Sequence, residues 1–451
     1  MAITVILGAQ WGDEGVSTQG ELNTTDDTQA LTILQKGKLV DGQCQEAQLC
    51  ARAAGGHNAG HLVRVNGVSY SFHLLPSGLI NPRCPSFFSE LKELEKNLTA
   101  VHDRILVSDR VNILLDLHIA VDGLEEEELG DAAIGTTRRG IGPCYQTSRA
   151  RTGIKMTDVF NPEVFEQKLR RLANGFQKRF GELLKYDIEA ELARFDEYRQ
   201  TLSKYVVDGV AFMKSAQESN MKIVIEGANA LMLDVDYGSY PFVTSSSTTL
   251  AGIIGGLALN PKNITETVGV VKAYTTRVGA GAFKTEDTEE IGTKLQEIGR
   301  EWGTSTGRRR RCGWLGRYNL ETLSRKSPWH ASKRSNTLQL DVLDTFETIK
   351  IAIAYKIDGE ELDSYPADLD ILNRAEVVYH EMPGWQKPTT NARTYYDLPR
   401  AARDYIEVSI SPRASITNSG TDHQQYIEKF VGVKIKYIGT GPDREAMVQR
   451  A

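Results

Sequence analysis

The sequence predicts an α/β protein built around a large, mostly parallel central β-sheet flanked by helices. Three observations support this fold class. Short β-branched runs, such as residues 222–227, recur along the chain and end in glycine-rich loops. Charged segments with helical periodicity separate several of these runs, the longest over residues 160–215. Strands that alternate with helices favour parallel pairing, and ligands of such sheets bind at the carboxyl ends of the strands.

The first strand and loop predict an anion site. Residues 3–7 form a β-branched run, and residues 8–15 contain three glycines around Asp13 and Glu14. Glycines let backbone N–H groups approach a phosphate closely. Two carboxylates would repel a phosphate, unless one of them binds a metal ion or accepts a proton. An ordinary strand-to-loop turn with two solvated acids is the alternative.

The other elements follow from periodicity and turn residues. Asn66-Gly67 between two alternating runs is a strong hairpin signal. We expect a hairpin of residues 62–65 and 68–75, helices over 85–97, 250–259 and 289–302, and strands at 104–107, 268–276, 349–355, 376–380 and 434–438. Loops rich in Gly, Ser, Thr or Arg follow several of these, at 53–61, 135–143, 234–249, 277–281, 304–314 and 439–444.

Composition and charge exclude several classes of protein. Of the 451 residues, 40% are hydrophobic and 25% charged, which is typical of a globular protein. A net charge of −6 argues against a dedicated nucleic-acid binder. The five cysteines form no CxxC pair, which argues against a zinc site and favours a reducing, cytosolic setting. We expect neither a signal peptide nor a membrane-spanning segment.

The loops together carry a set of motifs that resembles one family. They include GAQWGDEG at 8–15, GGHNAGH at 55–61, GTTRRGIGP at 135–143, STGRRRRCGW at 305–314 and GTGPDRE at 439–445. In this order, and over most of the chain, they resemble the adenylosuccinate synthetases of fungal type. The resemblance implies a P-loop-like GTP-binding ligase fold, a cytoplasmic homodimer, and Mg²⁺ as cofactor. It also implies that IMP and L-aspartate are joined through 6-phosphoryl-IMP while GTP becomes GDP and phosphate, in the first committed step of AMP biosynthesis.

The resemblance assigns two catalytic residues. Asp13 matches the base that removes the N1 proton of IMP, and it also matches a Mg²⁺ ligand together with the carbonyl of Gly60. His61 matches the acid that polarises the IMP oxygen and the γ-phosphate, and imidazole suits this because its pKa lies near neutral pH. A loop histidine with a purely structural role is the alternative for His61.

The remaining expected contacts divide between nucleotide and substrates. GTP is expected at Gly12, Asp13, Glu14, Gly15, Lys36, Gly37, Lys38, Gly60, His61, Leu62, Arg310, Gln339, Leu340, Asp341, Gly439, Thr440 and Gly441, with Asp341 reading guanine. IMP is expected at Asn58, Thr137, Asn229 and Thr244, and Arg151 is expected to reach the partner's IMP. L-Aspartate is expected at Thr304, Ser305, Thr306, Gly307, Arg308 and Arg310, where guanidinium groups suit carboxylates.

The chain departs from the family pattern in several places. We expect one domain over residues 1–451, with atypical inserts at 16–35 and 408–425. Each insert begins with Val and ends with Gln, which suggests translated, unspliced introns. An apolar strand expected after Cys84 is missing, and another is missing after Gly316. The family has other residues in place of Leu62, Asn229 and Gln339, so weaker nucleotide binding is expected.

Two alternatives to the ligase stay open. A GTPase switch would share the phosphate loop and a guanine-reading Asp, but it would leave residues 57–61, 135–143 and 305–314 without a second substrate. An inactive or misfolded family member would follow if the insert at 16–35 displaced Lys36 and Lys38 from the phosphate loop.

Overall fold

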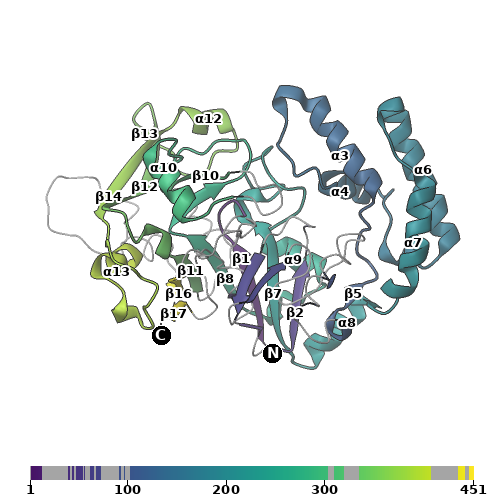
Figure 1. Cartoon of the computed structure of the whole chain (residues 1–451), viewed down its shortest axis with the longest axis horizontal. Helices are drawn as coiled ribbons and strands as arrows, with labels where there is room; N and C mark the ends of the chain where they lie inside the picture. Colours follow the sequence, from purple (N-terminus) through teal and green to yellow (C-terminus); the bar gives the residue numbers. More distant parts are fainter. Residues whose placement is uncertain are drawn as a thin grey trace.

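The computed structural model describes residues 2–12, 39–40, 43–44, 47–53, 55, 61–65, 68–72, 91–92, 96, 102–302, 309–318, 335–407, 435–441 and 446–450. Both predicted inserts, the predicted helix at 85–97 apart from residues 91–92 and 96, and the positions of the two missing strands lie outside these residues. Figure 1 shows the central sheet between a group of helices around α3 and α6 and a second sheet around β12.

The central sheet has seven strands and is mostly parallel, which confirms the predicted fold class. Its order is β17 (Met447–Gln449), β16 (Ile435–Gly439), β11 (Ser335–Gln339), β8 (Ile264–Lys272), β1 (Ala2–Gly8), β7 (Lys222–Ala230) and β2 (Leu49–Ala53). Among the described strands of this sheet, the β16–β17 pair alone is antiparallel. Ile3 and Val5 on one face of β1 and Ile6 on the other are 0% exposed, as expected of a parallel strand covered on both faces.

The register brings the carboxyl ends of the parallel strands to one edge. Gly8 on β1 lies opposite Ala230 on β7 and Val270 on β8. Gln339 on β11 lies opposite Lys272 on β8 and Gly439 on β16. The loops that follow these strands therefore share one side of the sheet.

A second sheet was not expected from the sequence. It contains β9 (Tyr274–Arg277), β10 (Arg311–Gly316), β12 (Thr348–Ile357), β13 (Glu360–Glu361) and β14 (Glu376–Pro383). The prediction of one strand over 268–276 was wrong, because the run divides at Ala273 into β8 and β9 of different sheets. The Ala273 carbonyl accepts a hydrogen bond from the Tyr405 hydroxyl at 2.6 Å. Lys272 and Tyr274, on either side of the break, are both buried, so burial does not mark it.

The helices predicted within residues 160–215 are present. The helical part of the fold contains α3 (Asp116–Leu129), α4 (Ile141–Arg149), α5 (Met156–Val159), α6 (Pro162–Phe180), α7 (Ile188–Leu202) and α8 (Gly209–Glu218). Asn161 caps α6 by accepting a hydrogen bond from the Val164 N–H at 3.2 Å, and Pro162 suits the first turn. Phe165 of α6 packs against Phe195 of α7 with ring centroids 4.7 Å apart.

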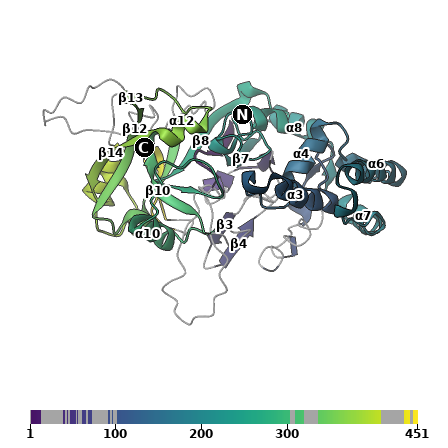
Figure 2. The ribbon, with the colours of Figure 1, turned by 90° about the horizontal axis from the view of Figure 1, so that it is seen from above.

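The predicted hairpin is formed by β3 (His61–Val65) and β4 (Val68–Phe72), and it ends earlier than expected. Figure 2 shows it between α3 and the second sheet. The strand predicted at 104–107 was wrong: η1 (His102–Arg104) precedes the short β5 (Val107–Ser108), which pairs with β6 (Val206–Val207). The described residues also include α9 (Leu250–Gly256), α10 (Glu290–Ile298), α12 (Leu369–Arg374), α13 (Arg400–Glu407), η2 (Gly130–Ala132), η3 (Gly181–Leu183), η4 (Leu231–Leu233), η5 (Pro261–Asn263), η6 (Asp341–Leu343) and η7 (Tyr395–Asp397). Over the described part of the chain, no helix has the length and apolarity needed to cross a bilayer.

Candidate active site

The carboxyl edge of the central sheet gathers predicted ligand-binding residues from neighbouring strands. Gly12 lies in the loop after β1, and Asn229 lies near the end of β7. Gln339 ends β11 and is followed by Asp341, while Gly439 ends β16. This is the edge at which parallel α/β sheets bind their ligands.

Many predicted site residues lie outside the described residues. These are Asp13, Glu14, Gly15, Lys36, Gly37, Lys38, Asn58, Gly60, Thr304, Ser305, Thr306, Gly307 and Arg308. The backbone of His61 and Leu62 begins β3, opposite residues 71–72 of β4. The roles of these residues therefore stay predictions.

The first loop is held against the junction of β8 and β9. The side-chain amide of Gln10 donates to the Tyr274 carbonyl at 2.8 Å, and its oxygen accepts from the Lys272 N–H at 3.0 Å. The Trp11 indole donates to the Ser239 hydroxyl at 3.2 Å. These bonds set the direction in which the chain leaves β1.

Three predicted ligand-binding residues have positive φ angles. Gly12 has φ +89°, and a Cβ placed there would lie 2.9 Å from the Leu233 Cδ1. Asn229 has φ +53° and Arg151 has φ +60°. Left-handed conformations are uncommon for residues other than glycine, although asparagine tolerates them. The exposed Arg151 lies just after α4, and nothing in one protomer tests its predicted reach into a partner.

Two carboxylates of α3 hold the loop that contains Thr137. Asp122 accepts from the Gly140 N–H at 2.8 Å and, through its other oxygen, from a threonine hydroxyl of the loop at 3.0 Å. Glu126 accepts from three consecutive backbone N–H groups at 2.9, 3.1 and 3.3 Å. The part of the expected loop after Gly140 is helical, because α4 begins at Ile141.

The Ser/Thr-rich loop that contains Thr244 is ordered by one buried carboxylate. Asp234 is 0% exposed. Its oxygens accept from the backbone N–H groups of Asp236, Tyr237, Thr248 and Thr249 at 2.7–3.3 Å and from the Ser247 hydroxyl at 3.2 Å. The Thr244 N–H donates to the Leu233 carbonyl at 2.9 Å, which places the loop beside η4.

The two segments predicted to bind guanine are adjacent. The Leu340 N–H donates to the Gly439 carbonyl at 3.1 Å, and Asp341 starts η6 directly afterwards. Thr440 is buried, and its N–H donates to the Ala446 carbonyl at 2.9 Å. The structure thus brings Asp341 and the 439–441 loop to the same strand ends.

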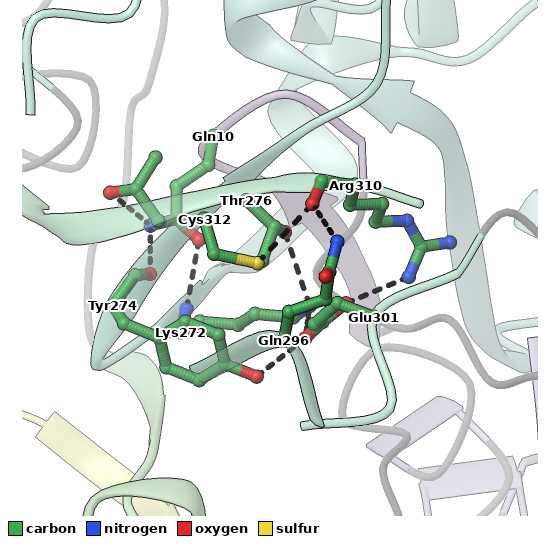
Figure 3. Close-up of polar contacts among 9 residues, drawn as sticks. Gln10, Lys272, Tyr274, Thr276, Gln296, Glu301, Arg310 and Cys312 are labelled. Atoms are coloured by element: carbon green, nitrogen blue, oxygen red, sulfur yellow. Dashed lines mark hydrogen bonds and ion pairs between the residues drawn. The ribbon is translucent and has the colours of Figure 1, made fainter. Parts of the chain in front are cut away.

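Arg310 lies in a buried cluster around Glu301, shown in Figure 3. Glu301 Oε1 accepts from Lys272 Nζ and from the Tyr274 hydroxyl, both at 2.5 Å, and Oε2 accepts from Arg310 Nη1 at 2.8 Å. Lys272 also donates to the Thr276 hydroxyl at 3.2 Å. The Arg310 side chain is 2% exposed, so it is far more buried than a surface basic patch would be.

Charge pairing and burial act in opposite directions on Glu301. Burial alone raises a carboxyl pKa, but Lys272 and Arg310 outweigh it and hold the pKa of Glu301 below its usual value. Burial and the neighbouring Glu301 raise the pKa of Tyr274 well above its usual range. The cluster is therefore ionised at Glu301 and neutral at the Tyr274 hydroxyl at neutral pH.

Arg277 ends β9, and its side chain is held by contacts within the fold. Its Nη1 donates to the Ala282 carbonyl at 2.6 Å and its Nη2 to the Ser239 hydroxyl at 3.1 Å. The guanidinium carbon lies 4.9 Å from the centroid of the Trp11 ring system. Burial lowers the pKa of Arg277 to about 10.

A cavity of about 790 Å³ lies beside the edge strand β2. Residues of β2, α4 and α9 line it, among them Arg52, Tyr145 and Arg149. No predicted substrate or nucleotide residue lies among its described lining residues, so we assign it no role in the site.

Among the described residues, no group of three or more His, Cys, Asp or Glu side chains is arranged to hold a metal ion. The expected Mg²⁺ ligands, Asp13 and the Gly60 carbonyl, lie outside those residues.

Sequence reasoning missed the residues that support the loops. Gln10 lies inside a recognised motif, yet nothing in the motif showed that its amide joins two sheets. Asp122 and Glu126 are four residues apart on a helix, so they share one face, and that spacing was an available signal. Asp234 and Glu301 could be found only from their burial in the fold.

The chain is similar to known proteins of one family. A family model described as adenylosuccinate synthetase matches residues 34–448. An adenylosuccinate synthetase of Fusarium vanettenii is 71% identical, with 100% of both chains covered. One of Neurospora crassa is 58% identical, covering 99% of this chain and 98% of its own.

A solved structure, the fully ligated adenylosuccinate synthetase of Plasmodium falciparum, has a TM-score of 0.85 and 35% identity, with 100% of both chains covered. The fungal relatives confirm the predicted fungal type, and the family confirms the prediction of a ligase enzyme. The chain belongs to the adenylosuccinate synthetase family.

Proposed function

We propose that this chain forms adenylosuccinate from IMP and L-aspartate, with GTP converted to GDP and phosphate. The observation that carries the proposal is the convergence of Gly12, Asn229, Asp341 and Thr440 at the carboxyl edge of the central sheet. Family membership supports the same reaction. We further propose that residues 1–451 act as one domain in the cytoplasm, in the first committed step from IMP to AMP.

The reaction proceeds in two steps. Asp13 removes the N1 proton of IMP, and the O6 oxygen then attacks the γ-phosphorus of GTP, releasing GDP and leaving 6-phosphoryl-IMP. The amine of L-aspartate attacks C6, the C6–O bond breaks to release phosphate, and the amine nitrogen loses one proton to solvent. His61 donates a hydrogen bond to the O6 oxygen and the γ-phosphate, which stabilises the charge that develops there.

The described residues bind and orient the reactants. Asp341 accepts hydrogen bonds from the N1 and N2 donors of guanine, which distinguishes GTP from ATP. Thr137 and Thr244 contact IMP from two loops that buried carboxylates order, and Asn229 contacts it from the end of β7. Preorganised loops of this kind lower the entropy lost when the reacting atoms are aligned. Mg²⁺ held by Asp13 and the Gly60 carbonyl would offset the charge of the GTP phosphates.

The proposal includes a homodimer in which Arg151 contacts the partner's IMP phosphate. The left-handed backbone of the exposed Arg151 supports a positional requirement at this residue, because such strain is usually kept where function demands it. We expect an Arg151→Ala variant to regain activity when it is mixed with a second variant that is catalytically inactive but keeps Arg151. In the hybrid dimer, the second variant's Arg151 can then reach the intact site of the first. Arg151→Ala with an unchanged KM for IMP would contradict the shared site.

An activity assay in which each substrate is left out in turn tests the function directly. Adenylosuccinate formation is followed by absorbance with IMP, GTP, Mg²⁺ and L-aspartate, and each substrate is omitted in turn. Turnover that requires all three supports the ligase. GTP hydrolysis that is independent of both IMP and L-aspartate would favour a GTPase switch instead.

The inserts are tested in the same assay. A chain that lacks residues 16–35 and 408–425 is compared with the full chain, and we expect the shortened chain to be the more active. Equal activity would refute the harm expected from the inserts, and their presence in mature transcript would refute their origin as introns.

A further inference from the structure

The backbone of Arg310 is held independently of its side chain. Its N–H donates to the Glu301 carbonyl at 2.9 Å, and its own carbonyl accepts from the Gln296 side-chain amide at 2.7 Å. An antiparallel bridge joins Trp302 to Arg309. The Arg309 guanidinium carbon also lies 5.7 Å from the centroid of the Trp302 ring. The residues before and after 303–308 are thus tied together.

The Arg310 side chain is oriented by Glu301, whose two oxygens have different partners (Figure 3). Lys272 and Tyr274 hold Oε1, which leaves Oε2 pointing toward Arg310 Nη1. The side chains of all three charged residues are at most 2% exposed. A carboxylate fixed at one oxygen can present the other in only one direction.

This cluster is anchored at the carboxyl edge of the central sheet. Lys272 is the last residue of β8, lies opposite Gln339 on β11, and donates its N–H to Gln10 in the loop after β1. Through Glu301 and Lys272, the Arg310 side chain is therefore held in place by the same strand ends that carry the candidate active site.

We propose that Glu301 is a positioning residue for the amino-acid substrate, because it holds the Arg310 guanidinium in the orientation that binds the substrate's carboxylate. The inference rests on the proposed function and on the expectation, from the family resemblance, that Arg310 contacts L-aspartate. A buried ion pair adds little net stability compared with apolar packing, so orientation is the better reason for its presence. Glu301 itself touches no substrate and acts only through Arg310.

Glu301→Gln is the primary test, since it removes the charge and keeps the shape. We expect the KM for L-aspartate to rise about 10-fold, in line with loss of a charge-assisted hydrogen bond, while the KM values for IMP and GTP change less than about 2-fold. The matched control is Glu286→Gln. Glu286 forms an ion pair at 2.5 Å with Arg311, the residue that follows Arg310. Loss of the Glu286 charge should leave the KM for L-aspartate unchanged.

A merely structural role would lower the melting temperature and leave the ratio of KM values unchanged, and that result would overturn the proposal. If Glu301→Gln does not fold, Tyr274→Phe removes one hydrogen bond from Oε1 and keeps every charge. We expect a rise of about 3-fold in the KM for L-aspartate from this variant, as loss of a single hydrogen bond implies. An unchanged KM there would also overturn the proposal.

Calorimetric titration with L-aspartate separates this inference from the proposed function. If the wild-type chain makes no adenylosuccinate but binds L-aspartate, a weaker Kd in Glu301→Gln still supports the positioning role, and an equal Kd overturns it. If the wild-type chain neither turns over nor binds L-aspartate, both proposals fail. Normal turnover with equal Kd values rejects the positioning role alone.

Discussion

The carboxylate of Asp122 accepts a hydrogen bond from the backbone N–H of Gly140 at 2.8 Å. This contact joins α3 to the start of α4 and holds the loop that contains Thr137. Gly140 has φ +73°, and a Cβ there would lie 2.8 Å from the His118 backbone, so helix and loop approach too closely for another residue. The position of a predicted IMP contact thus depends on a carboxylate outside the family motifs.

Replacing Asp122 should weaken IMP binding. In Asp122→Ala the Gly140 N–H loses its partner, which costs about 1–3 kcal/mol of stability, and the KM for IMP should rise about 10-fold. Steady-state kinetics and urea unfolding measure the two effects. Asp131→Asn is the control, since Asp131 is exposed after the same helix. Equal KM values for IMP in both variants would show that the loop is not ordered through Asp122.

Gly12→Ala should impair GTP binding more than stability. An alanine at φ +89° costs about 1–2 kcal/mol. Its Cβ would displace the Leu233 side chain, which lies beside the loop predicted to bind phosphate. We expect the Kd for GTP, measured by fluorescence with a labelled nucleotide, to rise at least about 10-fold. The control is Gly123→Ala, where no atom lies within 4 Å of the added Cβ. That helical substitution should stabilise the chain by about 0.5–1 kcal/mol. A normal Kd in Gly12→Ala would argue against a close approach of phosphate here.

Asp341→Asn should change the choice of nucleotide. An amide offers one acceptor where guanine presents two donors, so kcat/KM for GTP should fall at least about 10-fold, as unpaired polar groups in a nucleotide site typically cause. XTP has a carbonyl at C2 in place of the amine, and the amide can donate to it. The ratio of XTP to GTP turnover should therefore rise. A ratio identical to that of wild type would place guanine recognition elsewhere.

Glu301 should contribute to stability at neutral pH and lose that contribution in acid. Its pKa in the folded chain lies below the ordinary value of 4.5, because Lys272 and Arg310 favour the charged form. The stabilisation is therefore present above about pH 4.5 and is lost as the pH falls through the lower folded pKa. Urea unfolding from pH 7 to pH 3 should show a smaller acid loss in Glu301→Gln than in wild type. Parallel curves would mean that Glu301 does not titrate differently on folding.

Local patterns predicted most of the elements in the described residues. β1, β7 and the helices within residues 160–215 carry periodicities that packing preserves, so the sequence located them. The break at Ala273 escaped prediction because only this one residue separates two buried strands of different sheets. Glu301 was missed for a different reason: a single acid after a helix is expected to be solvent-exposed, and its buried partners on other segments become visible only in the folded chain.

By itself the sequence determined the family, the mostly parallel sheet and the order of the loops along the chain, because short motifs and local periodicity encode these. The tertiary structure alone decided which loops meet: the register places Gly12, Asn229, Asp341 and Gly439 at one edge. It also decided which carboxylates hold them, since Asp122, Asp234 and Glu301 each accept hydrogen bonds from segments 14 or more residues away along the chain. The strength of these hydrogen bonds depends on burial and on the direction of donor and acceptor, and the fold sets both of these, not the neighbouring residues in the sequence.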